Sequence, residues 1–476
     1  QSTTFDQITG LPEYQNEYIA GYTQNWSTFV YNPATDAPAL QAMNGARYID
    51  YSGDESWGPK IDGLPYAPWY SWNKWDPDYA KQVPLVAHPD NIKDFYETGV
   101  AYNTNIAISK AGDGYSTRFS FTNITRTGIT PNSKQNKNFL AWNIGVTPFS
   151  KLTISSTINA SFTKRNAVPD EGYGQQTIGS FNQWFHRDID MKKLRNYKNP
   201  DGTFTSWNIG GPRNSAPKYW DNPYTEVYEN INRGNSTTLF GNINATYSIL
   251  KNLKASFNAQ GNYASGYADG RVASGTLVLA NFNTQQSRAR ENTYIWDLSY
   301  DTKFGDDFTL RAAAYAEMRF FRNENISEST VGGLTIPGYY NIAASKDRPT
   351  VSNSYSEKQT KSVYGYASLG FRNMLFVDLN LRNDVSSTLP ADNNSYLYGG
   401  LSASFVFTEL FKNRDILSFG KIRGSAGRVG SDTDPYQIHQ VYSFAGFYGS
   451  TPSMTIPNQI PNEQLRPAIS NAYEVG

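Results

Sequence analysis

The residues that could act as nucleophiles, acid–base catalysts or metal ligands are few in this chain of 476 residues. It contains no cysteine, which excludes disulfides, thiolate nucleophiles and thiolate metal sites. Its three histidines, His88, His186 and His439, lack the spacing of a metal-binding motif. The sequence has neither a glycine-rich phosphate loop nor a nucleophile elbow. We therefore predict that the protein binds no catalytic metal and no cofactor.

Adjacent carboxylates offer an alternative, that of a glycoside hydrolase or a peptidase on a β scaffold. They occur at Asp54–Glu55 and at Asp170–Glu171. Successive side chains of a strand point to opposite faces, whereas the acid and the base of a glycosidase must flank the same bond. These pairs are therefore weak candidates, and the sequence predicts a protein that is not an enzyme.

Side chains suited to holding a ligand are concentrated in residues 361–407. Small or apolar residues alternate there with polar ones over three segments, so each segment has an apolar face and a polar face. If the polar face lines a lumen, its aromatic and charged members could contact a substrate, although most inward residues of a barrel only line the wall. The candidates for substrate binding are Tyr364, Tyr366, Asp378, Arg382 and Asp384.

Aromatic residues make up 15% of the chain and gather in long irregular stretches. The tryptophans of residues 57–75 and the aromatic residues of 184–224 could stack on sugar rings or meet a protein partner. For Trp57, packing within its own loop is the favoured interpretation. The candidates for substrate or partner contact are Trp69, Trp72, Trp184, Tyr219 and Trp220.

The elements that would position these residues are about twelve two-faced segments, each about as long as a tilted membrane-spanning strand. Residues 152–163 are the clearest case, with Leu152, Ile154 and Ile158 on one face and only Thr, Ser and Asn on the other. No apolar run approaches the ~18 residues that a spanning helix requires. The sequence thus predicts that strands, rather than helices, cross the membrane.

The connections between these segments alternate between short and long. Short ones at 110–114 and 372–374 are separated by long ones at 164–235, 264–290 and 320–359. Outer-membrane barrels have short periplasmic turns and long external loops, whereas the loops of a β-sandwich need not differ in length between its two ends. A propeller should show a sequence repeat of ~40 residues, and none is visible. We predict an all-β fold, a large transmembrane antiparallel β-barrel with short periplasmic turns and long extracellular loops.

Residues 1–99 are expected to hold one barrel strand and long aromatic-rich extracellular loops. Residues 100–476 are expected to form part of the same transmembrane β-barrel. Basic and acidic residues both number 42, so the formal net charge is zero, and the mean hydropathy is −0.58. There is thus no excess of positive charge to attract nucleic acid. The predicted transmembrane barrel implies a lipid bilayer as its surroundings.

Motifs rich in Trp, Gly, Pro and Asp are spread over the whole chain. Two of them read SWGPKIDG at 56–63 and RNDVSSTL at 382–389. In their types and order, these motifs resemble those of the SusC/RagA-type TonB-dependent outer-membrane transporters. Further similar segments lie at 11–18, 95–99, 127–133, 199–202, 420–426, 429–436 and 465–476.

The resemblance implies active uptake of a large nutrient, an oligosaccharide or a peptide, across the bacterial outer membrane. It also implies a SusD-like surface lipoprotein as a lid and the TonB complex as the source of energy. The plug domain and the TonB box of such a transporter would lie before Gln1, and its last strands after Gly476. A passive porin or a surface adhesin is the alternative that shares the barrel.

Overall fold

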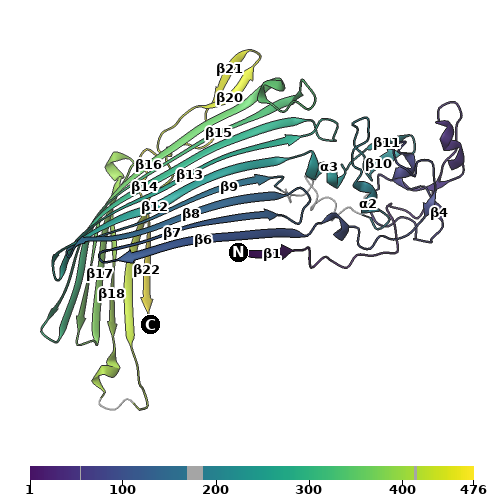
Figure 1. The fold of residues 1–476 in the computed structure, drawn as a ribbon. Helices are drawn as coiled ribbons and strands as arrows, with labels where there is room; N and C mark the ends of the chain where they lie inside the picture. Colours follow the sequence, from purple (N-terminus) through teal and green to yellow (C-terminus); the bar gives the residue numbers. More distant parts are fainter. Residues whose placement is uncertain (54, 169–185, 412–414) are drawn as a thin grey trace.

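The computed structural model describes residues 1–53, 55–168, 186–411 and 415–476, and its main feature is an antiparallel sheet of 14 strands (Figure 1). The strand order is β1-β6-β7-β8-β9-β12-β13-β14-β15-β16-β17-β18-β19-β22. The strands are β1 (Ser2–Asp6), β6 (Gly99–Gly112), β7 (Tyr115–Thr127), β8 (Lys134–Phe149), β9 (Leu152–Asn166), β12 (Asn232–Leu250), β13 (Leu253–Val272), β14 (Asn281–Phe304), β15 (Phe308–Leu334), β16 (Ser345–Phe371), β17 (Leu375–Ser386), β18 (Ser395–Phe405), β19 (Ile422–Ser431) and β22 (Ala468–Val475).

Shorter elements lie in the connections. Four two-stranded pairs form there, namely β2 with β3, β4 with β5, β10 with β11 and β20 with β21, within the described ranges. Their bounds, with those of the helices, are β2 (Ser27–Thr28), β3 (Arg47–Tyr48), β4 (Pro65–Tyr66), β5 (Val83–Pro84), β10 (Ile209–Gly211), β11 (Asn214–Pro217), β20 (Ser443–Tyr448), β21 (Thr451–Thr455), α2 (Met191–Leu194), α3 (Pro223–Tyr228) and the 3-10 helices η1 (Pro38–Met43), η2 (Trp69–Trp72), η3 (Lys93–Phe95), η4 (Ile342–Ala344), η5 (Ala391–Asn393) and η6 (Phe407–Leu410).

The turn between β16 and β17 shows how the short connections are built. Arg372 and Asn373 both have positive φ, 46° and 56°, and the Met374 amide donates to the Phe371 carbonyl at 2.9 Å. Two residues with positive φ give the kind of tight hairpin turn that matches the twist of the flanking strands. Asp307 of the neighbouring turn accepts from Nε of Arg372 at 2.8 Å. The predicted chain reversal at this point is thus present, and the neighbouring turn stabilises it through Asp307.

One face of the sheet carries an apolar band. On β15 this face begins at Phe308 and ends at Phe320, with Leu310, alanines and Met318 between them. About 12 residues at ~3.3 Å each, tilted by about 45°, span about 28 Å, which matches the apolar band of a membrane barrel with aromatic residues at both borders. Val363 on the same face is 67% exposed. We therefore assign this face to lipid and call it the outer face.

Strands β13 to β16 are longer than the sequence predicts. Long loops are expected at 264–290 and 320–359, yet strands occupy most of both ranges and the connections shrink to 273–280 and 335–344. This part of the prediction is wrong because both faces of the extensions are polar, so the apolar alternation stops at the border of the band. The β15–β16 hairpin continues beyond the band as a polar arm.

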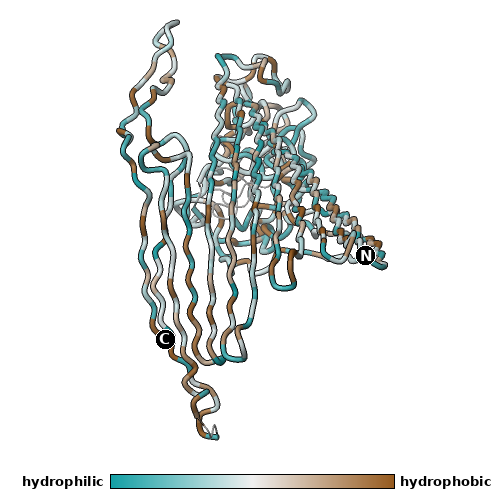
Figure 2. The backbone as a smooth tube through the Cα atoms, turned by 90° about the vertical axis from the view of Figure 1, so that its left-hand side faces the viewer, coloured by the Kyte–Doolittle hydropathy of each residue, from teal (hydrophilic) through white to brown (hydrophobic). Residues whose placement is uncertain are grey.

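The sheet is twisted and curved, with β1 at one edge paired to β6 and β22 at the other paired to β19 (Figure 1). Hydrophobic and hydrophilic residues alternate along the strands in Figure 2. The predicted all-β antiparallel wall of a large barrel is confirmed. Among the described residues, no helix combines the length and the apolar character needed to cross a membrane.

Two loop regions fold together into a compact body at the long-loop end of the sheet (Figure 1). We call this body the loop unit and define it as residues 7–53 and 55–98, the first region, with residues 186–231, the second region. Its core combines Phe29 and Phe95 of the first region with Leu194 of the second, each no more than 2% exposed. The first and second regions therefore share one hydrophobic core, although the strands β6 to β9 separate them in the sequence.

Buried polar contacts join the two regions of the loop unit. The side-chain amide of Asn91 donates to the carbonyls of His186 at 2.7 Å and Ile189 at 3.0 Å. Nζ of Lys193 lies 2.8 Å from Oδ1 of Asp76. The pairing fixes the position of the second region against the first.

Candidate ligand-binding surface on the inner face

Aromatic and charged side chains form two rows across the inner face of β15 to β18. In the first row, direct cross-strand pairing places Tyr364 between Tyr315 and Arg382, and Arg382 beside Tyr398. All occupy the parity opposite to the apolar band, so they face away from lipid. We call both rows together the tyrosine–arginine ladder; its members are Tyr315, Glu317, Ser362, Tyr364, Arg382, Asp384, Tyr396 and Tyr398.

Arg382 is the centre of the ladder. Its Nε donates to Oδ1 of Asp384 at 2.7 Å, and its Nη2 donates to Oγ of Ser362 at 2.8 Å and to Oε1 of Glu317 at 3.4 Å. Its guanidinium carbon lies 4.5 Å from the ring centroid of Tyr364. The guanidinium therefore joins three strands, and most of its donors are already used within the wall.

The tyrosines of the ladder are stacked and bonded in place. The rings of Tyr315 and Tyr364 are nearly parallel, at 9°, with centroids 4.6 Å apart. The Tyr398 hydroxyl donates to Oδ2 of Asp384 at 2.7 Å. Tyr366 lies at the border of the ladder, 6.5 Å from the Tyr315 ring, and is 39% exposed. It is thus the ring with most surface left for a ligand.

Three of the five predicted substrate-binding residues come together in the ladder, namely Tyr364, Arg382 and Asp384, and Tyr366 borders it. Asp378 lies on the same face of β17 but nearer the β16–β17 turn. Its Oδ2 accepts there from Oγ of Ser402 at 3.2 Å. The ladder thus sets two carboxyl groups, those of Glu317 and Asp384, against the single guanidinium of Arg382. Stacked rings beside carboxylates can hold hydroxyl or ammonium groups of a ligand.

Two of the motifs noted in the sequence meet beside the ladder. Ser386 in 382–389 donates to Oδ2 of Asp432 in 429–436 at 2.5 Å. Nζ of Lys358 lies 2.7 Å from Oδ1 of the same carboxylate. These motif residues thus hold β16, β17 and the end of β19 together, which is a structural role.

A second inner-face feature is a polar hollow of about 630 Å³ on β9, β12, β13 and β14. Its side chains are mostly amides and hydroxyls, which can bond a neutral polar ligand. Nothing in the sequence distinguishes these side chains, because alternation gives the face on which they lie but not the curvature of the sheet that brings them together. They are Thr157, Asn159, Thr238, Asn242, Gln260, Asn262, Glu291 and Thr293, with Phe240 beside them.

Some of the aromatic residues predicted to contact a substrate or a partner are buried in the loop unit, whereas others are exposed. Trp69 and Trp72 are only 6% and 5% exposed, so they pack inside the unit and offer no contact surface. Trp57, for which packing is the favoured interpretation, is instead 67% exposed. Tyr219 is 59% exposed, and Trp220 packs partly against the core. Trp184 lies outside the described residues.

The candidates for catalysis do not form a cluster in the described part of the chain. His186 is fully buried; its Nε2 donates to the Gly53 carbonyl at 3.0 Å, and its Nδ1 accepts from Ser56 at 3.0 Å. Burial lowers the pKa of His186 to about 4, so it is neutral and structural. Across the described ranges, no group of three His, Asp or Glu residues is placed to hold a metal. Asp54, Asp170 and Glu171 lie outside these ranges.

The fold is similar to that of solved transporters, whereas no protein-family model and no curated protein matches the sequence. A structure of the RagAB peptide transporter matches with a TM-score of 0.67 and 14% identity, over 86% of this chain and 46% of that chain. The RagAB peptide importer in its 'closed-closed' state matches with a TM-score of 0.65 and 16% identity, over 81% and 43%. The chain thus spans less than half of the length of these solved chains. As the motifs predict, the chain has the barrel fold of the SusC/RagA-type outer-membrane transporters.

Proposed function

We propose that the protein imports a large nutrient, an oligosaccharide or a peptide, across the bacterial outer membrane by TonB-dependent active transport. The observation that carries the proposal is a wall with an apolar outer band and a tyrosine-rich polar inner face, in a fold shared with the RagAB peptide importer. Once closed, such a wall encloses a lumen. The tyrosine–arginine ladder and the polar hollow would then line the path of the cargo.

A SusD-like surface lipoprotein is the proposed partner, as the motif resemblance implies. The loop unit stands at the long-loop end of the sheet, which is the external end of a barrel. Trp57 and Tyr219 are among the exposed aromatic side chains of this unit, and such a partner could cover them. Co-purification of the full-length protein with a lipoprotein, and loss of that lipoprotein in a Trp57→Ala/Tyr219→Ala double variant, would support this surface.

The transport proposal is tested by uptake in cells with and without TonB. Cells that carry the full-length protein are given fluorescent oligosaccharides and peptides, and accumulation is measured apart from surface binding. Active transport predicts that uptake stops without TonB while surface binding persists. Unchanged uptake in these cells would instead establish a passive porin, and turnover of the cargo by the purified protein would establish an enzyme.

The inner-face site is tested in the same cells with Tyr366→Ala, which removes the most exposed ring at the border of the ladder. Uptake is expected to fall about tenfold, since stacking of one ring contributes about 1 kcal/mol or more. Leu401→Ala, which truncates an exposed side chain on the outer face, is the matched control. Equal effects of the two substitutions would count against a ligand site at Tyr366.

A further inference from the structure

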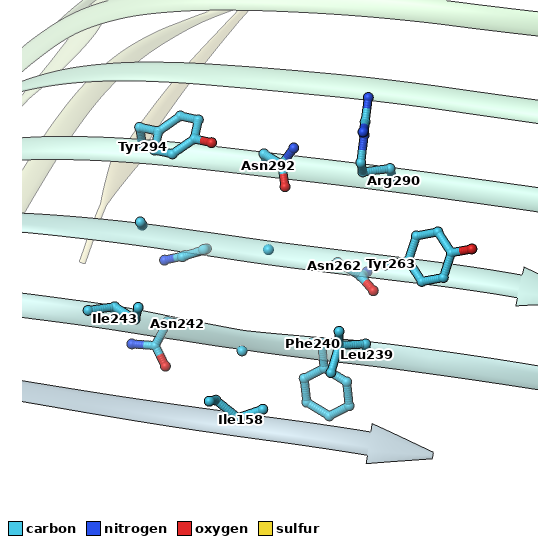
Figure 3. A pocket seen from close by; sticks show the side chains of 14 residues that line it. Ile158, Leu239, Phe240, Asn242, Ile243, Asn262, Tyr263, Arg290, Asn292 and Tyr294 are labelled. Atoms are coloured by element: carbon cyan, nitrogen blue, oxygen red, sulfur yellow. The ribbon is translucent and has the colours of Figure 1, made fainter. Parts of the chain in front are cut away.

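A groove of about 410 Å³ crosses β9, β12, β13 and β14 on the outer face of the sheet (Figure 3). Leu239, Ile243, Tyr263 and Tyr294 are part of its lining and share the parity of the apolar band. Leu239 and Ile243 are 45% and 53% exposed. The groove is therefore open to the lipid side, behind the polar hollow of the inner face.

Two paired glycines produce the groove. Gly241 and Gly261 lie directly opposite each other on β12 and β13. A Cβ at Gly241 would collide with the Thr157 carbonyl oxygen, so only glycine fits there. A Cβ at Gly261 would meet only Oδ1 of Asn292, at 3.6 Å. The floor at these positions is bare backbone, and larger residues form the walls.

The position of the groove relative to the membrane surface follows from the residues on the outer face of β14. Toward the long-loop end, this face changes from Leu298, Trp296 and Tyr294 to Asn292, Arg290 and Arg288. Each step of two residues advances about 6.6 Å. Aromatic residues mark the border between hydrocarbon and headgroups in a membrane barrel. The Tyr294 end of the groove is thus at that border, and Arg290 is at the level of the headgroups of the external leaflet.

The arginine at this end lacks a counter-charge from the protein. Arg290 is paired across the sheet with Arg322, a like charge, which is an unfavourable neighbour. Arg322 is compensated by Glu324 at 2.5 Å and Glu357 at 2.8 Å. Neither Arg290 nor Arg288 has an ion pair with any residue that the structure describes. An anion at headgroup depth would supply the missing charge.

We propose that this groove binds lipid A, the phosphorylated glycolipid of the external leaflet, with one acyl chain against Gly241 and Gly261 and a phosphate on Arg290. Apolar contact alone would not select an occupant, because bulk lipid is as apolar as the groove. Selection comes from the shape made by the glycines and from the charge-assisted bonds of a guanidinium to phosphate.

The test is a native mass spectrometry titration of the detergent-solubilised full-length protein with lipid A. Phosphatidylglycerol and dephosphorylated lipid A are titrated in parallel. Lipid A is expected to bind at least about tenfold more tightly than its dephosphorylated form, and Arg290→Gln to weaken lipid A binding about tenfold. Gly261→Leu, which fills the groove from an open position, is expected to weaken it at least as much.

Two matched variants serve as controls on the outer face. Lys361→Gln removes a cation of β16 outside the groove, and Ala316→Leu adds the same bulk on β15. Both are expected to bind lipid A within about twofold of the unsubstituted protein, and gel mobility before and after heating verifies that every variant is folded. Equal loss with Lys361→Gln would mean diffuse attraction and would overturn the site, as would full binding by Gly261→Leu. Tighter binding of phosphatidylglycerol would overturn the assignment to lipid A.

Discussion

At the scale of single residues, Arg382 is the side chain on which the inner-face rows depend. Arg382→Ala would leave the Asp384 carboxylate, which is 6% exposed, without its cationic partner. Removing one member of a buried ion pair costs several kcal/mol, and partial exposure of Arg382 reduces this to about 2–3 kcal/mol. Urea unfolding of the full-length protein in lipid vesicles measures the loss. Arg382→Lys should be intermediate, because lysine retains the charge without the planar fork.

His186 gives the loop unit a component of stability that depends on pH. Its pKa of about 4 in the folded protein, against 6.5 for a free histidine, means that the unfolded chain takes up this proton first. The His186 contribution is therefore complete above pH 6.5 and falls as the pH approaches 4, by about 2 kcal/mol at pH 5.

Burial has the opposite effect at two carboxyl groups of the same unit, since it raises the pKa of Asp188 to about 6 and that of Glu226 to about 7. Acidification therefore stabilises the fold through these groups. Asp188 and Glu226 contribute to stability in both the unsubstituted protein and the His186→Gln variant. The difference in the free energy of opening between the two proteins therefore reports the contribution of His186. Hydrogen exchange of residues 186–194 measures this difference. From pH 7.5 to pH 5, the unsubstituted protein should lose about 2 kcal/mol of stability relative to the variant. A constant difference would contradict the buried neutral histidine.

At the scale of elements, the assignment of the outer face makes a sharp prediction for β15. Ala314 lies midway between Phe308 and Phe320 on the lipid side. An arginine there should cost about 2–4 kcal/mol, the penalty for a cation near the bilayer midplane. Asn380→Arg is the matched control, since Asn380 is exposed on the inner face of β17 at a similar height. Folding yield into vesicles should fall for Ala314→Arg alone.

The sequence predicts strands well where one face is apolar and poorly where neither is. Residues 361–371 alternate cleanly and are strand, but residues 345–360 are also strand and are polar on both faces. Backbone pairing with neighbouring strands holds the latter in place, and such pairing leaves no mark in side-chain polarity. Element type was therefore predictable within the membrane band, whereas strand length beyond it was not.

The same limit applies to the candidate site. Parity and a short turn suffice to bring Tyr364 and Arg382 together, because their strands are adjacent in the chain. The burial of Trp69 and Trp72 depends on packing between the two regions of the loop unit, which are distant in sequence. Local patterns do not encode such packing, so composition could not separate a core tryptophan from an exposed one.

At the scale of the whole molecule, the loop unit depends on contacts between its two regions. Asn91 is 1% exposed and bonds two carbonyls of the second region. Asn91→Leu would leave the Ile189 carbonyl buried without its donor and the His186 carbonyl with only the 3.4 Å bond from the Ile189 amide, at a cost of about 1–3 kcal/mol. Faster hydrogen exchange is expected in residues 186–194, with no change in the sheet. Asn16→Ala, at an exposed position, is the control, and exchange that rises equally in the strands would contradict an independent role for the unit.

The polar arm formed by β15 and β16 has a consequence for the speed of capture. From Phe320 to Leu334 the strand adds about 14 residues, which corresponds to on the order of 30–40 Å of height above the apolar band after tilt. A diffusing solute therefore collides with protein well before it reaches the lipid surface. Shortening this arm would reduce the frequency of productive encounters while leaving the residence time of a bound molecule unchanged.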